Sequence, residues 1–265
     1  MIQTRQFDGV TQYRMGRELD GQVLYWCAAY LVEDLLIDSG CAHTAPELLA
    51  ALAGRGVRRV VNTHHHEDHI GANALLAEKL GLELYSPLEA IPLIAEQPEL
   101  YPYQLLTWGM APRSRPQPLG EEISTASHRF QVLPMPGHCH ELVVLWEPAQ
   151  RWAFVSDLWL VRRPKTSRNF ENNLQTLTSL QRLKALRPRV LFTGMGDIEE
   201  DADAALGETI AWLEGQRNQI IDLAEAGLEP KEIVQKLYGR ESPMYERTQG
   251  QFSYENFVRS FLKGP

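Results

Sequence analysis

The chain has 265 residues, 44% of them hydrophobic, and a formal net charge of -8. This length fits one large domain and is enough to bury a core without disulfides. The negative charge argues against a nucleic-acid partner, since phosphate backbones repel an acidic protein. The three cysteines are widely spaced. The sequence shows neither a signal peptide nor an apolar run of about 20 residues, so we expect a cytoplasmic protein that does not enter a membrane.

Short strands and helices alternate in the first half of the chain. Strands are expected within residues 3–37, ending at Asp38, and again over residues 57–62. A helix is expected from Thr44, where Glu47 gives capping-box spacing, to about Leu52. Another should follow residue 70 and end at Gly81. Residues 97–120 contain five prolines, which predict an insertion loop.

Strands and helices alternate again in the second half. We expect strands over residues 130–133, 143–146, 152–155 and 189–192, with a helix over residues 174–186 before the last strand. From residue 201 onward the pattern is helical, and breaks near Gly227 and Gly239 predict three helices. Two passes of this kind predict an α/β fold of two packed sheets with helices outside. We expect one domain over residues 1–265, with a C-terminal helical segment at about 201–265.

A histidine-rich run follows the strand at residues 57–62. His64 and His66 are two positions apart, so in extended chain their imidazoles point to the same side and can reach one ion. Asp68 continues this alternation, and His69 falls where the chain turns into a helix. Three imidazoles and one carboxylate suit zinc, iron, manganese or nickel, whereas calcium prefers oxygen ligands alone.

This run, His64-x-His66-x-Asp68-His69, resembles the HxHxDH signature of the metallo-β-lactamase superfamily. Three further motifs in the same order resemble those of the family, and together they extend the resemblance over most of the chain. They are Leu36-Ile37-Asp38-Ser39-Gly40, Pro136-Gly137-His138 and Ser156-Asp157. The resemblance implies a metallo-β-lactamase-type αββα sandwich with C-terminal helices, in the glyoxalase II-like branch.

The resemblance also implies a metal centre of one or two divalent transition-metal ions, with zinc first and iron or manganese as alternatives. The first site would use three histidines, and the second two ligands and a bridging carboxylate: His64, His66 and His138, then Asp68 and His69, with Asp157 bridging. A metal-activated water or hydroxide would be the nucleophile. Asp68 would be the catalytic residue that steers it and moves its proton.

One residue departs from the family pattern. Met195 stands where the family's last histidine ligand is expected, and a thioether is a poor ligand for a borderline dication. Three alternatives follow from this. The second site is empty, or it is filled by a substitute such as Asp197 or Glu199 or binds weakly with extra water, or another histidine serves, with His140 and His128 as candidates.

Residues outside the metal motifs are candidates for substrate binding. Arg163 and Lys165, between Arg162 and Arg168, follow Asp157 closely and could hold an anionic group, or could belong to a solvated loop. Tyr101 and Trp108, with Tyr103 between them, could form an aromatic lid or pack against the domain.

These features predict an enzyme, a metal-dependent hydrolase of a small ester, thioester, lactone or amide. The alternative is a mononuclear iron oxidoreductase that resembles sulfur dioxygenases, because a depleted second site fits that pattern. A nuclease is disfavoured by the acidic charge. A non-catalytic relative is disfavoured by the intact histidine run. The sequence does not predict the physiological substrate or the oligomeric state.

Overall fold

The computed structural model describes residues 1–96 and 98–262. The first of its two large sheets has seven strands in the order β1-β2-β5-β6-β7-β8-β9. Its strands β6 to β9 run parallel, and its others antiparallel. The strands are β1 (Ile2–Phe7), β2 (Val10–Met15), β5 (Cys27–Val32), β6 (Leu35–Ile37), β7 (Arg59–Val61), β8 (Glu83–Ser86) and β9 (Gln117–Pro118), and a hairpin of β3 (Glu18–Leu19) and β4 (Gln22–Val23) stands apart.

The second sheet has six strands in sequential order, from β10 to β15. Only β13 and β14 pair in parallel in this sheet, since α5 connects them. The strands are β10 (Glu122–Ser124), β11 (Arg129–Pro134), β12 (Val143–Glu147), β13 (Trp152–Ser156), β14 (Val190–Thr193) and β15 (Ile198–Glu199).

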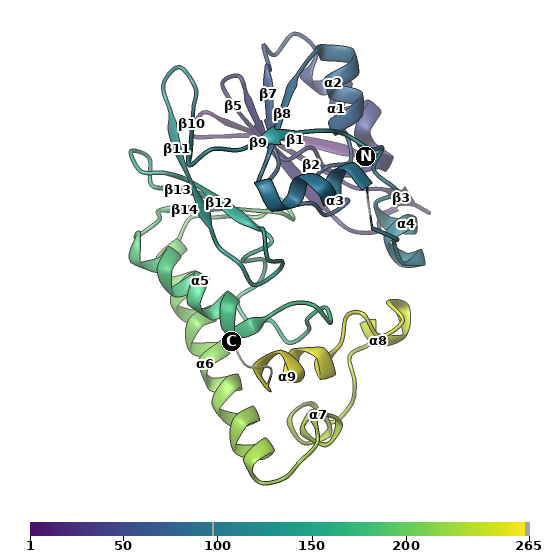
Figure 1. The fold of residues 1–265 in the computed structure, drawn as a ribbon, viewed down its shortest axis with the longest axis vertical. Helices are drawn as coiled ribbons and strands as arrows, with labels where there is room; N and C mark the ends of the chain where they lie inside the picture. The colour runs from purple at the N-terminus through teal and green to yellow at the C-terminus, as the bar shows by residue number, and fades with distance from the viewer. Residues whose placement is uncertain (97, 263–265) are drawn as a thin grey trace.

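Three hydrophobic clusters define four layers. One cluster lies between the sheets and joins Tyr30 and Ile37 of the first to Phe154 and Phe192 of the second. Another joins the first sheet to α1 and α2, and a third joins the second sheet to α5, α6, α7 and α9 (Figure 1). The order helix, sheet, sheet, helix confirms the predicted αββα sandwich.

The helices agree with most of the predicted segments. They are α1 (Ala45–Leu52), α2 (Asn73–Leu80), α3 (Ile91–Glu96), α4 (Pro102–Thr107), α5 (Asn173–Ala185), α6 (Ala202–Glu225), α7 (Pro230–Tyr238), α8 (Met244–Arg247) and α9 (Tyr254–Leu262), with single 3-10 turns at Ala42–Thr44 and Leu88–Ala90. Helix α2 ends at Gly81 in the left-handed conformation, as predicted. Within these described residues, no helix combines the length and apolar character needed to cross a membrane.

Three predictions about helices were wrong. Of the segment 97–120, residue 97 lies outside the described residues, and the rest is not only a loop, because it contains α4 and β9. Over the described residues from 201 to 262 the chain forms four helices rather than three, and α7 to α9 lie in the lower part of the molecule in Figure 1. Thr44 precedes α1 but makes no capping hydrogen bond to it, since its hydroxyl donates to the carbonyl of Cys41 instead.

The parallel strands bring distant segments to one edge. Strands β6 and β7 are paired in parallel, so Asp38 and the histidine run both leave the first sheet at the same edge. Strands β13 and β14 are also paired in parallel, so Asp157 and Gly194, which follow them, leave the second sheet at one edge. The carboxyl ends of parallel strands are a common place for functional sites. This topology therefore brings the polar residues of three segments, and Gly194 of a fourth, to the ends of parallel strands.

Candidate metal centre

Asp38 organises the loop that follows β7. Its carboxylate accepts hydrogen bonds from the backbone N–H of Thr63 at 2.8 Å and from the Thr63 hydroxyl. Its Oδ2 lies 2.7 Å from Nδ1 of His69, which fixes the orientation of that imidazole. Asp38 and Ser156 both have positive φ, at 59° and 49°. Strained backbone of this kind is frequent at functional sites.

Three histidines converge at the first position. Nδ1 of His66 lies 3.0 Å from Nε2 of His64 and 2.9 Å from Nε2 of His138. A tetrahedral zinc ion, with Zn–N of about 2.0–2.1 Å, holds its ligand nitrogens roughly 3.3 Å apart. All three residues are buried. Their arrangement fits an ion at this position.

A second group lies beside the first. His64, His69 and Asp157 offer donor atoms within 4.8 Å of one another, and Asp68 Oδ2 lies 3.8 Å from His69 Nε2. Asp157 reaches both positions, with Oδ1 3.3 Å from His69 Nε2 and Oδ2 3.5 Å from His138 Nε2. Among the described residues, His69 Nε2 and Asp68 Oδ1 are buried polar atoms without a hydrogen-bond partner. Buried polar atoms rarely stay unpaired, so these donors fit a metal ion.

The electrostatic environment differs between the two positions. Burial holds the pKa of His64 and of His66 well below the usual range, so both are neutral and able to bind a metal. Burial acts in the same direction on His69, but the carboxylates of Asp38, Asp157 and Asp68 outweigh it and raise its pKa. Burial, reinforced by Asp157, raises the pKa of Asp68 to about 6.

A third group of possible metal ligands, His65, Cys139 and Glu141, is already paired within the protein. His65 Nδ1 and a carboxylate oxygen of Glu141 are in direct contact, and Cys139 lies beside them. Burial, with the nearby Glu141 carboxylate, raises the pKa of the Cys139 thiol. The thiol therefore stays protonated, and these three residues are bonded to one another rather than free to bind an ion.

Arg168 is the cation of its segment that is buried next to His66. It is 4% exposed, and Nη1 lies 3.1 Å from Nδ1 of His66. Its Nε is buried without a hydrogen-bond partner among the described residues. Arg163 instead binds Glu208 at 2.8 Å, and Lys165 lies over the ring of Trp212, both on α6. The structure thus separates Arg168 from the other cations of this segment.

The aromatic residues at and beside the ends of α4 differ in their surroundings. Trp108 is 5% exposed and packs in the cluster behind the first sheet, where it meets the ring of Tyr25 edge-on at 5.4 Å. Of the two alternatives for Trp108, this burial favours packing against the domain. Tyr101 is half-buried at the start of α4, and its ring centroid lies 6.2 Å from that of Tyr103.

Three of the four candidate substitutes for the absent histidine contact other residues. His140 is exposed, and His128 lies beside the ring of Trp152. The carboxylates of two other candidates pair with arginines, Asp197 with Arg14 at 3.5 Å and Glu199 with Arg162 at 2.7 Å.

Two contacts made by residues of the predicted motifs or by Met195 were not predicted from the sequence. Glu171 lies 3.0 Å from Nδ1 of His138 and orients that ring. Tyr25 donates a hydrogen bond to the sulfur of Met195 at 3.2 Å. Neither residue lies in a motif, and a contact across 170 positions leaves no local pattern in the sequence.

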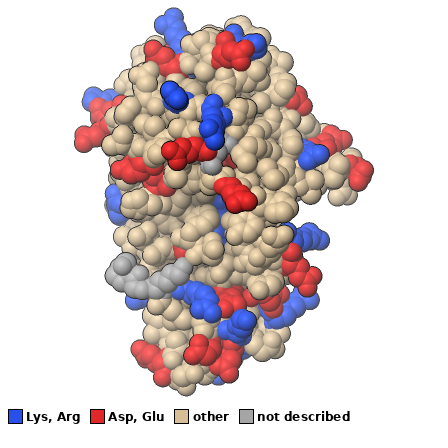
Figure 2. Space-filling model, turned by 45° about the vertical axis from the view of Figure 1, so that its right-hand side comes forward, with Lys and Arg blue, Asp and Glu red and all other residues tan. Residues whose placement is uncertain are grey.

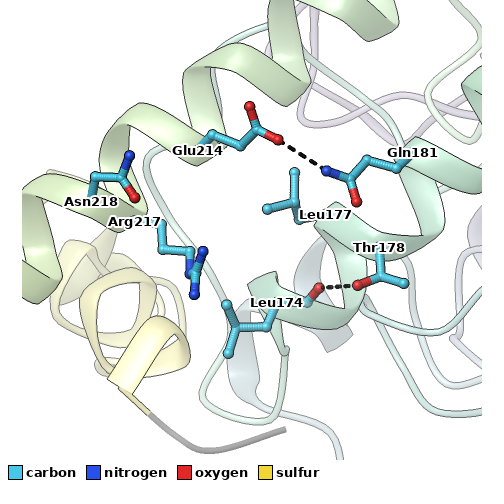
Figure 3. Close-up of a pocket in the computed structure, with 7 residues that line it drawn as sticks. All are labelled: Leu174, Leu177, Thr178, Gln181, Glu214, Arg217 and Asn218. Carbon is cyan, nitrogen blue, oxygen red and sulfur yellow. Dashed lines mark hydrogen bonds between the residues drawn. The ribbon is translucent and has the colours of Figure 1, made fainter.

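A separate surface groove of about 420 Å³ lies between α5 and α6. Figure 3 shows Leu174 and Gln181 from α5 facing Glu214 and Arg217 from α6. Gln181 donates a hydrogen bond to Glu214 at 2.9 Å across it. None of the lining residues belongs to the histidine and carboxylate groups. We place the candidate site at the histidine and carboxylate groups rather than at this groove, because catalysis requires converging polar side chains.

Comparisons with known proteins identify relatives of this chain. The chain is 30% identical over 162 residues to a hydroxyacylglutathione hydrolase of Rhizobium meliloti, covering 59% of the chain and 56% of that protein. It is 28% identical to that of Bdellovibrio bacteriovorus, covering 50% and 46%. The chain thus spans about half the length of these curated relatives.

Solved structures share the fold. A metallo-beta-lactamase family protein from Thermus thermophilus is 21% identical, with a TM-score of 0.68 over 97% of this chain and 92% of that one. A metallo-beta-lactamase from Pontibacter korlensis is 18% identical, with a TM-score of 0.65 over 81% and 99%. The family model of the metallo-beta-lactamase superfamily matches residues 27–195. The resemblance noted in the sequence is therefore confirmed, and this chain belongs to the metallo-beta-lactamase superfamily.

Proposed function

We propose that this protein is a metal-dependent hydrolase of small ester or thioester substrates, with zinc as the first candidate for its ion. The observation that carries the proposal is the convergence of His64, His66 and His138 beside a second group with buried, unpartnered donor atoms. The hydroxyacylglutathione hydrolases that the chain resembles are named for a thioester, which supports this substrate class.

The residues of the site have distinct tasks in this proposal. A divalent ion bound here would make hydroxide available near neutral pH and polarise the acyl oxygen of the substrate. Asp68 Oδ1 is a buried carboxylate oxygen with no partner among the described residues, so it can orient the attacking water and accept its proton. Asp38 and Glu171 keep His69 and His138 in place from behind.

We further propose that the substrate carries an anionic group and that Arg168 binds it. Acidic and basic side chains are interspersed over the face shown in Figure 2, so a broad positive field does not mark the entrance on that face. Arg168 offers a buried cation next to His66. A guanidinium binds carboxylates with two parallel hydrogen bonds, and a low dielectric strengthens them.

The test is a hydrolysis assay on tag-free protein reconstituted with zinc. The substrates are a hydroxyacyl thioester of glutathione, a neutral acyl thioester and an oxygen ester. We expect thioester hydrolysis that a chelator abolishes and that Asp68→Asn lowers by about 100-fold, within the range for a general base. Asp222→Asn, a carboxylate on α6 away from the site, is the matched control and should keep full activity. Oxygen consumption with a sulfur substrate by the iron-loaded protein, without hydrolysis, would favour the oxidoreductase alternative instead.

A further inference from the structure

A short segment between α8 and α9 connects two parts of the chain that lie far apart in the sequence. The side chain of Gln251 accepts a hydrogen bond from the hydroxyl of Tyr103 on α4. The ring of Phe252 packs against the guanidinium of Arg168, whose Cζ lies 5.4 Å from the ring centroid. We call residues 251–253 the strap, because they join α4 to the segment that carries the buried arginine.

The backbone of the strap is held on both sides. Ser253 and Ser167 exchange two backbone hydrogen bonds, each of 3.2 Å, and so tie the strap to the residue next to the buried arginine. The backbone N–H of Phe252 donates to the hydroxyl of the buried Thr248 at 2.9 Å. The Ser253 hydroxyl accepts a hydrogen bond from the backbone N–H of Asn256 in α9 at 2.9 Å. These bonds keep the Phe252 ring at a defined place against the guanidinium.

The hydrogen bond of Arg168 inside the site depends on a nitrogen that an ion would use. Arg168 Nη1 lies 3.1 Å from Nδ1 of His66, and that Nδ1 also lies 3.0 Å and 2.9 Å from the nitrogens of His64 and His138. A ring nitrogen whose lone pair is given to an ion cannot also accept a hydrogen bond. The contact with the Phe252 ring does not depend on this nitrogen. It can therefore hold the guanidinium when the site is loaded.

We propose that Phe252 is a positioning residue that holds the Arg168 guanidinium in place for the substrate, so that the strap sets the preference for anionic substrates. The face of an aromatic ring attracts a cation, and the attraction is stronger for a cation that is removed from water, as Arg168 is. The ring carries no net charge, so unlike a carboxylate it does not compete with the anionic group of the substrate. This inference rests on the anion-binding role of Arg168 in the proposed function.

The test measures kcat and KM of the zinc-loaded full-length protein with a hydroxyacyl thioester of glutathione and with a neutral acyl thioester. Phe252→Leu should raise KM for the anionic thioester about tenfold and change kcat and the other KM by less than about twofold. Phe252→Tyr keeps the ring and should keep the KM of the wild type. In the Arg168→Met background, Phe252→Leu should add no further rise, because the two residues act as one unit. Calorimetry with S-methylglutathione, which carries the carboxylates but no thioester, should show the same differences in Kd without turnover.

The chain offers a matched control for the loss of such a contact. Phe7 on β1 lies under the guanidinium of Arg5, whose Cζ is 5.7 Å from the ring centroid, so Phe7→Leu removes the same kind of contact at another place. Phe7→Leu should keep the kinetics of the wild type. Circular dichroism of each variant shows whether it is folded, and Phe252→Met replaces the leucine variant if that one does not fold.

Two results would overturn the inference and leave the role of Arg168 intact. One is a rise of KM for the anionic thioester in Arg168→Met but not in Phe252→Leu. The other is an equal rise of both KM values in Phe252→Leu, which would mean that the ring only fills space. An unchanged KM in Arg168→Met would overturn the inference together with the anion-binding part of the proposed function. A wild type that neither hydrolyses a thioester nor binds S-methylglutathione would count against both in full.

Discussion

At the scale of single residues, Asp38 has several roles at the centre. It holds the His69 imidazole and the backbone of Thr63 with one carboxylate. Asp38→Asn keeps the size of the side chain but cannot accept both sets of hydrogen bonds. We expect it to weaken zinc binding about 10–100-fold, the usual effect of losing the partner that orients a metal-binding histidine. Asp34→Asn is the control, since Asp34 pairs with Arg59. A competition titration measures both, and equal affinities would contradict the role of Asp38.

Arg168 gives a second prediction at this scale. If its guanidinium binds the anionic group of the substrate, Arg168→Met should raise KM for an anionic thioester about 10–100-fold, as expected for a lost hydrogen bond to a charged group of about 1.5–3 kcal/mol. The KM for a neutral thioester should change little. Lys165→Met is the control, because Lys165 lies over Trp212. An equal rise of KM in both variants would contradict a role specific to Arg168. It would instead support anion binding by residues 162–165.

At the scale of elements, Glu33 links the two sheets. It lies in the turn between β5 and β6, and its carboxylate accepts a hydrogen bond from the backbone N–H of Ser127 at 3.0 Å. Hydrogen bonds from the Thr125 side chain and from Ser127 lower its pKa from 4.5 to about 2. A lowered pKa in the folded state stabilises the fold above pH 4.5, and the contribution disappears as pH falls to about 2.

Glu33→Gln should therefore destabilise the protein near neutral pH and make little difference near pH 2. The expected loss is small, because the group is exposed and screened by solvent. Urea unfolding of the wild type and the variant at several pH values measures the difference. Glu246→Gln, on the exposed surface of α8, is the control. A difference that is constant with pH would show that the carboxylate charge is not its cause.

Local patterns in the sequence predicted most elements but not all. Helix α1 and strand β6 lie where they were expected, because their apolar period and turn residues are local signals. Helix α4 was missed because prolines dominate its segment. Pro102 is its first residue, the one position where a proline favours a helix. The metal motifs were readable since each lies within a few residues, whereas the contact of Tyr25 with Met195 depends on the packing of two sheets.

At the scale of the whole molecule, the centre joins the two sheets. The histidine run and Asp38 come from the first sheet, and His138 and Asp157 come from the second. An ion bound between them would act as a cross-link that the unfolded chain lacks. At a free metal concentration about 100 times its Kd, binding stabilises the fold by about 2.7 kcal/mol. For a chain of this size, this corresponds to a change in Tm of about 5–10 °C.

Removal of the metal by a chelator should therefore lower Tm by about 5–10 °C, and added zinc should restore it. Differential scanning calorimetry measures the shift. His66→Ala removes a nitrogen shared by the contacts of the first position, so its Tm should respond weakly to either treatment. A Tm of the wild type that ignores both chelator and zinc would mean that no ion joins the sheets.

The metal content of the isolated protein tests the central claim most directly. Inductively coupled plasma mass spectrometry on tag-free protein gives the zinc, iron and manganese content of each chain. The proposed centre predicts at least one ion per chain as purified and two after reconstitution with zinc. No bound metal, even after reconstitution, would contradict the proposed centre and with it the proposed hydrolase.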